Sequence, residues 1–246
     1  MTDQAIPVLK QALQIEPTNT AARMTLLGEA VKTSDYEEVI DICQTGTVAN
    51  PDVLEFYYYL AIGYNQIQQK DSVISVCQRA LQHVADDSDS NLVSDFYAIM
   101  GDAYHSKKMM QETYDAYESA LQYNSNNIMA LNNYAYYLSL ERRDLDKAEE
   151  MSYKTVKAEP NNATYLDTYA WILFEKANYE QAKIYIDQAL QNDDSLSAEV
   201  LEHCGDIYYH TGDAVKALEF WKKAKESGSE STTLDRKIKQ KKYMRK

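Results

Sequence analysis

The sequence predicts an all-α protein, a right-handed α-solenoid of stacked antiparallel helix pairs, and three observations support this prediction. First, a short motif recurs: residues 101–105 are GDAYH and residues 205–209 are GDIYY. Second, the recurrence belongs to a period close to 34 residues that runs almost from end to end. Units of that length bury their apolar faces only by stacking on their neighbours. Third, 7 glycines and 4 prolines are too few for the many turns of an all-β fold.

Composition and charge narrow the classes of function. Of the 246 residues, 45% are hydrophobic, which is enough for a continuous core, and the net charge is −13. Residues 232–246 carry +6, so the rest of the chain is strongly acidic. An acidic body repels phosphate backbones, which argues against nucleic-acid binding and against the helical repeats that read RNA through basic grooves. No stretch approaches the roughly 20 apolar residues of a membrane span. No signal-peptide pattern is present, but we expect the true N-terminus to be missing from this chain, so cytoplasm and periplasm both stay open.

The period divides the chain into units of two helices, which we name helix A and helix B. Counted from the start of helix A, position 8 is small in five units and is Leu27 in the first, whose helix pair should therefore be looser. Small residues there let the two helices approach closely, while larger apolar residues such as Met100, Tyr104 and Tyr117 fill the space between them. We expect helix B of an incomplete unit at 1–19, six complete units, and a basic C-terminal capping helix at 232–246. The complete units are 20–53, 54–87, 94–127, 128–162, 163–196 and 198–231.

This pattern resembles the tetratricopeptide repeat (TPR) family. In that family helix A carries a large apolar residue, then Gly or Ala, then Tyr, and helix B carries Ala, an aromatic residue, Ala and finally Pro. The match covers essentially residues 3–231 and recurs six times, and the wording YLDTYAWILFEKANYEQAKIYIDQAL is most like TPR proteins of Bacteroidota. Two departures are local: residues 88–93 are inserted between the second and third units, and the turn at 142–144 carries one extra residue.

The N-terminal end resembles half a unit. Ile6, Leu9 and Leu13 form one apolar face, and Pro17 follows as it does after a helix B. A stack that starts on half a unit exposes the face that the missing helix would cover. We therefore expect this chain to be the C-terminal piece of a longer protein, and the alternative is a natural start with a single capping helix.

The C-terminal end resembles a finished stack. Thr232 and Asp235 have the spacing of a capping box, and Leu234 and Ile238 lie on one face of the short helix that follows. We expect its lysines to face solvent and to complement the helix dipole. The alternative is a polybasic tail for an anionic membrane or a nucleic acid.

No set of residues indicates catalysis. The chain contains no GxGxxG, P-loop, GxSxG or HExxH motif. His203 and His210 share a helix face, but a spacing of seven is poor for a metal site. Cys43, Cys77 and Cys204 have neither metal-ligand spacing nor an even number, so we expect core thiols. The sequence predicts no enzyme, no cofactor and no metal.

The resemblance implies where a partner would bind. In TPR arrays, helix-A residues at positions 2, 5, 9 and 12 line a concave groove that commonly holds an extended peptide or a partner helix. These positions are acidic with an aromatic stripe, which implies a protein or peptide partner with Lys or Arg plus apolar or aromatic anchors. The competing interpretation is that they are ordinary solvated helix faces, with Tyr and Trp buried against neighbouring helices. The predicted groove residues are Glu55, Tyr58, Asp95, Asp102, His105, Asn132, Tyr136, Asp167, Trp171, Glu202, Asp206 and Tyr209.

One mode of TPR binding is excluded by these residues. TPR domains that clamp the C-terminal carboxylate of heat-shock chaperones use Lys at position 5 and Asn at position 9 of one unit. None of the six units carries that Lys. The sequence thus predicts a non-catalytic interaction scaffold without a carboxylate clamp.

Two other functional hypotheses stay open. The chain could be an accessory TPR region of a larger enzyme or cell-envelope assembly whose working domain precedes it. It could also associate with itself through the N-terminal half-repeat.

Overall fold

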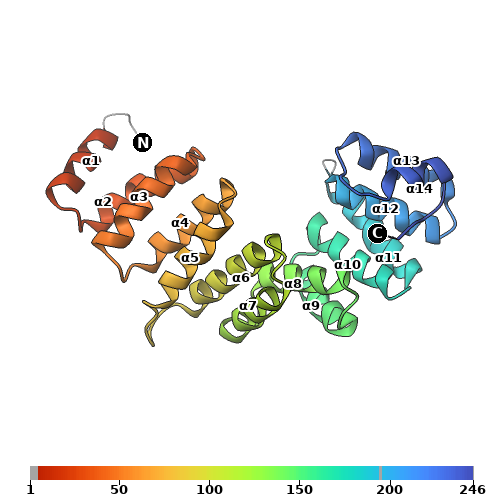
Figure 1. Cartoon of the computed structure of the whole chain (residues 1–246), viewed down its shortest axis with the longest axis horizontal. Coiled ribbons are helices and arrows are strands. Elements are labelled where there is room, and N and C mark those ends of the chain that lie inside the picture. The colour runs from red at the N-terminus through yellow and green to blue at the C-terminus, as the bar shows by residue number, and fades with distance from the viewer. Residues whose placement is uncertain (1–4, 194–195, 246) are drawn as a thin grey trace. The chain divides into compact units, whose positions relative to one another are not determined.

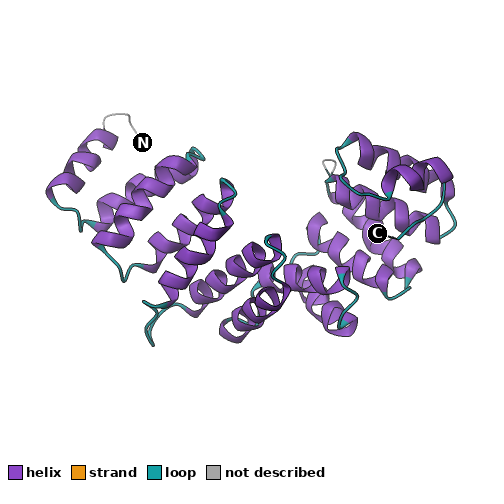
Figure 2. Cartoon of the chain, viewed as in Figure 1, coloured by secondary structure: helices purple, strands orange, loops and turns teal. Residues whose placement is uncertain are grey.

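The computed structural model describes residues 5–193 and 196–245, and this part of the chain consists of α-helices joined by short loops, without a strand (Figures 1 and 2). The prediction of an all-α fold built from helix pairs is confirmed. The helices are α1 (Ala5–Ile15), α2 (Thr20–Lys32), α3 (Tyr36–Ala49), α4 (Leu54–Gln66), α5 (Lys70–Leu81), α6 (Ser90–Ser106), α7 (Met110–Tyr123), α8 (Ile128–Leu140), α9 (Leu145–Ala158), α10 (Ala163–Glu175), α11 (Tyr179–Asn192), α12 (Ala198–His210), α13 (Ala214–Glu226) and α14 (Leu234–Gln240).

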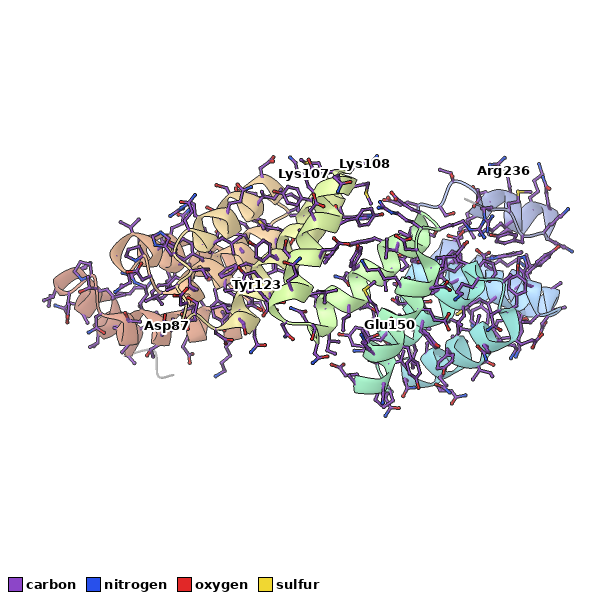
Figure 3. The ribbon with its side chains drawn as sticks, turned by 90° about the horizontal axis from the view of Figure 1, so that it is seen from below. Asp87, Lys107, Lys108, Tyr123, Glu150 and Arg236 are labelled. Carbon is purple, nitrogen blue, oxygen red and sulfur yellow. The ribbon has the colours of Figure 1, made fainter. Side chains whose placement is uncertain are left out.

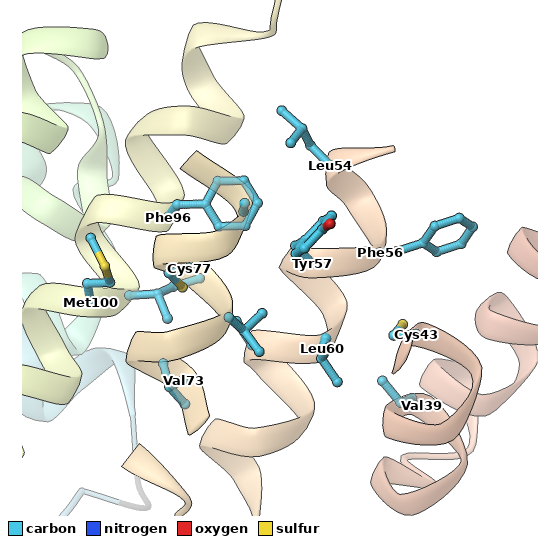
Figure 4. Packing of buried hydrophobic residues seen from close by; sticks show 14 of the residues in the cluster. Val39, Cys43, Leu54, Phe56, Tyr57, Leu60, Val73, Cys77, Phe96 and Met100 are labelled. Atoms are coloured by element: carbon cyan, nitrogen blue, oxygen red, sulfur yellow. The ribbon is translucent and has the colours of Figure 1, made fainter. Parts of the chain in front are cut away.

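The chain forms two compact units, Met1–Ala130 and Leu131–Lys246, which we call the N-terminal unit and the C-terminal unit. The boundary falls within α8. In the N-terminal unit, Phe56, Tyr57 and Phe96 are central to one apolar cluster between α2 and α7 (Figure 4). In the C-terminal unit, one cluster that includes Leu173 and Ile186 and another that includes Trp221 hold α10 to α14 together. The division of 20–231 into six repeats stays a prediction.

A left-handed residue follows the first helix of each pair. The residue at position 15 has a positive φ in all six expected units, from 54° to 90°. The next amide then donates a hydrogen bond to the carbonyl five residues earlier, as from Asp35 to Ala30 and from Asp213 to Tyr208. This is the Schellman arrangement, which satisfies the last carbonyls of helix A and reverses the chain into helix B. The left-handed residues are Ser34, Gln68, Lys108, Arg142, Ala177 and Gly212.

Side-chain caps begin several helices. Asn19, Asp35, Asp89, Asn162, Ser197 and Asp213 each accept a hydrogen bond from a backbone amide in the first turn. These bonds satisfy amides that have no partner within the helix. Asp89 explains why most of the expected insertion at 88–93 is helical: α6 begins at Ser90, and Val93 is buried. The extra residue at 142–144 is accommodated by a second left-handed residue, Asp144, with φ of 45°.

The capping box expected at the C-terminal helix is wrong. The helix α14 begins at Leu234 after Thr233, whose side chain makes no capping hydrogen bond. Asp235 instead binds the ammonium of Lys225 on α13. The helix is therefore held by its contacts with α13 and α12 rather than by its own first turn.

Two glycines allow an aromatic ring to lie directly on helix A. A Cβ at Gly101 would lie 2.8 Å from Cζ of Tyr117, and a Cβ at Gly205 would lie 2.3 Å from Cδ1 of Trp221. Both rings are fully buried, and each also donates a hydrogen bond to the aspartate that follows the glycine, Asp102 or Asp206.

The three cysteines are buried and form no disulfide, as expected, and burial raises the pKa of Cys43 to about 12.

Exchanging alanine and glycine at position 15 tests the left-handed turn. Ala177→Gly should stabilise the chain by about 1 kcal/mol, because alanine is strained at its φ of 59°. Gly212→Ala, where φ is 90°, should destabilise it by a similar amount. Chemical denaturation measures both, and effects of equal sign would contradict the turn geometry.

The same substitution at two helical glycines should have opposite effects. Gly205→Ala should destabilise the chain by about 1–3 kcal/mol, because the held ring of Trp221 cannot move away. Gly28→Ala, whose Cβ would meet nothing within 4 Å, should stabilise it by about 0.5–1 kcal/mol through helix propensity. A Gly205→Ala variant that melts at the wild-type temperature would refute the close contact.

Candidate functional site

The twelve predicted groove residues all lie on the first helix of a pair. In each unit, the first helices of two successive pairs contact one another directly. These contacts join α4 to α6 and α10 to α12. The N-terminal unit holds Glu55, Tyr58, Asp95, Asp102 and His105. The C-terminal unit holds Asn132, Tyr136, Asp167, Trp171, Glu202, Asp206 and Tyr209.

In the N-terminal unit these residues remain partly or fully exposed. Tyr58 is half-buried and meets the ring edges of Tyr59 and Phe96 at centroid distances of 5.3 and 6.4 Å. Burial raises the pKa of Asp95, although Asn127 donates a hydrogen bond of 2.8 Å to its carboxylate and opposes the shift. Glu55 is exposed at the start of α4. This surface offers an aromatic ring beside carboxylates.

Two of the predicted carboxylates also hold the helix pairs together. Tyr117 donates its hydroxyl hydrogen to Asp102, and Nε1 of Trp221 donates to Asp206 at 2.8 Å. In both cases the ring lies on the preceding glycine, and the donor is 15 residues after the aspartate. The sequence predicted that these aspartates either contact a partner or are solvated, and it did not predict their packing role. The signal for the packing role was present: a Gly-Asp pair followed at a fixed distance by Tyr or Trp.

An aromatic stack joins α10 and α12 in the C-terminal unit. The ring of Trp171 lies nearly parallel to the rings of Phe174 and His203, with centroid distances of 4.8 and 4.0 Å. Nδ1 of His203 lies 3.0 and 3.1 Å from the two carboxylate oxygens of Asp167. Trp171 is only 7% exposed, and Asp167 and His203 are also buried. Most of the Trp171 side chain is therefore buried against neighbouring helices, as the alternative interpretation expected.

Two buried polar atoms in this region have no hydrogen-bond partner among the described residues. They are Nε1 of Trp171 and Oδ1 of Asn132. Both belong to predicted groove positions, on α10 and α8. A buried polar group without a partner costs about 1–3 kcal/mol, so each of these atoms would gain from a hydrogen bond to a ligand. The hydroxyl of Tyr136 interacts with Glu199; burial raises the pKa of Tyr136, and the carboxylate of Glu199 acts in the same direction.

A buried lysine neutralises the acidic pair on α12. Nζ of Lys237 lies 2.8 Å from Oε1 of Glu202 and 2.7 Å from Oδ2 of Asp206, and all three side chains are almost fully buried. Burial raises the pKa of Asp206, and Lys237 acts in the opposite direction. The expectation that the lysines of this helix face solvent is therefore wrong for Lys237, although Arg236 is exposed (Figure 3). Helix α14 aims Lys237 at α12, and the two carboxylates are not on an open surface.

The chain continues past α14 back toward α10. Lys241 is left-handed, with φ of 50°, and turns the chain. The ring of Tyr243 then meets His210 and Phe174 edge-on, at centroid distances of 4.5 and 5.8 Å. Nη2 of Arg245 lies 3.2 Å from Oε2 of Glu175. Burial raises the pKa of Tyr243 to about 12.

The remaining predicted residues add little to these clusters. The ring of Tyr209 is partly buried, and its centroid lies 5.8 Å from that of Trp221. His105 is near the end of α6.

Within residues 5–193 and 196–245, no group of three His, Cys, Asp or Glu side chains could hold a metal ion. In the same residues, no helix is both long and apolar enough to span a membrane.

Solved structures with the same arrangement of helices identify the fold. A tetratricopeptide repeat protein from Parabacteroides merdae ATCC 43184 matches with a TM-score of 0.64 at 15% identity, over 96% of this chain and 90% of that one. The chain has the TPR fold. The Parabacteroides protein also comes from Bacteroidota, the lineage that the sequence resembles. PilW, a type IV pilus biogenesis factor, matches with a TM-score of 0.68 at 17% identity, over 90% of this chain and 98% of that one.

Another neighbour is YrrB, described as a TPR protein with an unusual peptide-binding site. It has a TM-score of 0.56 at 14% identity, over 75% of this chain and 92% of that one. No family model and no curated protein matches the chain. At identities this low, the structural similarity establishes the fold only, and the partner has to be inferred from the surface.

Replacing Lys237 tests the buried ion cluster. Lys237→Met should destabilise the chain by about 3–5 kcal/mol, because it leaves Glu202 and Asp206 buried without a counter-charge. Lys239→Met is the matched control in the same helix, and it should have almost no effect because Lys239 is exposed. Thermal and urea unfolding measure both, and equal small effects would show that Lys237 is solvated.

Proposed function

We propose that this chain is a non-catalytic scaffold that binds a protein segment carrying Lys or Arg and an aromatic anchor. TPR-fold neighbours support an interaction scaffold in general, and YrrB is described as having a peptide-binding site. The observation that carries the finer proposal is the pair of buried, unpartnered polar atoms, Oδ1 of Asn132 and Nε1 of Trp171. They lie on neighbouring helix-A positions that the TPR pattern assigns to ligand contact.

The chemistry of this surface favours a cationic partner. In the C-terminal unit the ring of Phe174 on α10 is followed by the carboxylate of Glu175, which already binds the partly exposed guanidinium of Arg245. Aromatic faces and carboxylates both attract ammonium and guanidinium groups. A backbone carbonyl of the bound segment would accept the free hydrogen of Trp171 Nε1, and a backbone amide would donate to Oδ1 of Asn132.

The N-terminal unit extends the same chemistry to a second surface. Tyr58, Asp95 and Glu55 combine an aromatic ring with carboxylates on α4 and α6. The alternative of an accessory region in an envelope assembly stays a prediction.

A displayed peptide library provides the probe for this proposal. Selection on the full chain should enrich peptides with Lys or Arg close to an aromatic residue. Enrichment of acidic peptides, or of none, would contradict the proposed surface chemistry.

The two tryptophans provide a matched pair of variants. Trp171→Phe should weaken the selected peptide about threefold to tenfold, since it keeps the aromatic stack and removes only a donor that has no internal partner. Trp221→Phe should leave the affinity unchanged and reduce stability by about 1–3 kcal/mol, because Nε1 of Trp221 already binds Asp206. Fluorescence anisotropy gives the affinities, and denaturation gives the stabilities. Unchanged binding by Trp171→Phe would remove Trp171 from the site.

A further inference from the structure

The C-terminal residues of the chain have the chemistry expected of the partner. Lys237, Tyr243 and Arg245 supply an ammonium, an aromatic ring and a guanidinium within nine residues. Each of the three contacts helix-A side chains of the C-terminal unit. Resting on the proposed function, we infer that Tyr243 and Arg245 act as an internal ligand of this surface, and that the partner is a segment with an aromatic residue and a nearby arginine that displaces them.

Tyr243 contacts aromatic side chains on α10 and α12, the helices that carry predicted groove residues. Its ring meets Phe174, which occupies position 12 of its unit, and His210, at the end of the next helix A. Phe174 in turn stacks on Trp171. Tyr243 therefore lies at the end of the stack that carries the unpartnered Nε1 of Trp171. A partner aromatic residue anchored there would use the ring faces and edges that Tyr243 now uses.

The contacts of Arg245 supply the charge. Its guanidinium binds Glu175, a side chain that is only 6% exposed and that also binds Arg142. A buried carboxylate is costly unless cations and hydrogen bonds compensate it. Release of Arg245 would leave Arg142 as the remaining cation on Glu175, so a partner arginine or lysine would restore the second one.

The segment divides into a part that is fixed and a part that can be exchanged. Lys237 is completely buried between two carboxylates, and its release would leave both without a counter-charge. Tyr243 is half-buried, the Arg245 side chain is 51% exposed, and both lie beyond the end of α14. Competition at Tyr243 and Arg245 therefore needs no unfolding of α14.

An internal ligand reduces the apparent affinity of any competitor. The apparent dissociation constant rises by the inverse of the fraction of chains in which the site is open. A tethered segment also acts at a high effective concentration, so even weak contacts compete with a free peptide. Removing the contacts of Tyr243 and Arg245 should therefore increase the affinity of a free peptide of the same chemistry.

The test uses the full chain and a labelled peptide of residues 241–246, KKYMRK, as the probe. The double variant Tyr243→Ala/Arg245→Ala should bind this peptide at least about tenfold more tightly than the unaltered chain. The control Lys242→Ala should behave like the unaltered chain, because Lys242 is exposed. A peptide with alanine in place of its tyrosine should bind none of the three. Melting temperatures of all three chains show that α14 and its lysine remain in place.

The outcomes separate this inference from the proposed function. If the library-selected peptide and KKYMRK bind the unaltered chain and the double variant equally, the internal ligand is refuted and the binding surface stands. If no peptide binds either chain in a way that depends on Trp171, the proposed function itself fails. Tighter binding by the double variant that is weakened about threefold to tenfold when Trp171→Phe is added supports both.

Discussion

The left-handed residue after the first helix of each pair is the constraint on which the rest of the structure depends. It terminates helix A, satisfies its last carbonyls and reverses the chain within about three residues. Because the reversal is so tight, helices A and B must lie against one another along their length. Close packing then requires small residues where the axes approach, which is why Gly101 and Gly205 lie under the rings of Tyr117 and Trp221.

The same packing determines how polar groups are used. Asp102 and Asp206 follow the two glycines, and each binds the aromatic side chain that its glycine admits. A carboxylate on the helix-A face can thus serve the internal structure and an external partner. In the C-terminal unit the internal use is complete, since Lys237 binds both Glu202 and Asp206 in a buried cluster. Fully compensated buried charges hold a local geometry and are not available to a ligand.

The groups that remain available to a partner are polar atoms whose hydrogen bonds are not made within the chain. The stack around Trp171 buries its rings but leaves Nε1 without an acceptor among the described residues, and Oδ1 of Asn132 likewise has no donor. Tyr243 and Arg245 cover the neighbouring rings and Glu175 while staying partly exposed. The candidate site is therefore a partly closed surface whose chemistry resembles that of the segment that closes it.

Much of the fold was predictable from sequence because its determinants are local. The period, the small residues at position 8 and the core cysteines depend on spacing along one or two helices, and so they can be read without coordinates. The burial of Lys237 and the return of Tyr243 to Phe174 depend on contacts between residues 31 to 69 positions apart. The sequence predicted a basic capping helix there and expected its Lys and Arg residues to be solvated, as basic residues usually are. It determined by itself that this is an all-α repeat protein with acidic and aromatic helix-A faces. Only the tertiary structure decided which of those side chains are closed, because burial depends on which distant side chains pack against them.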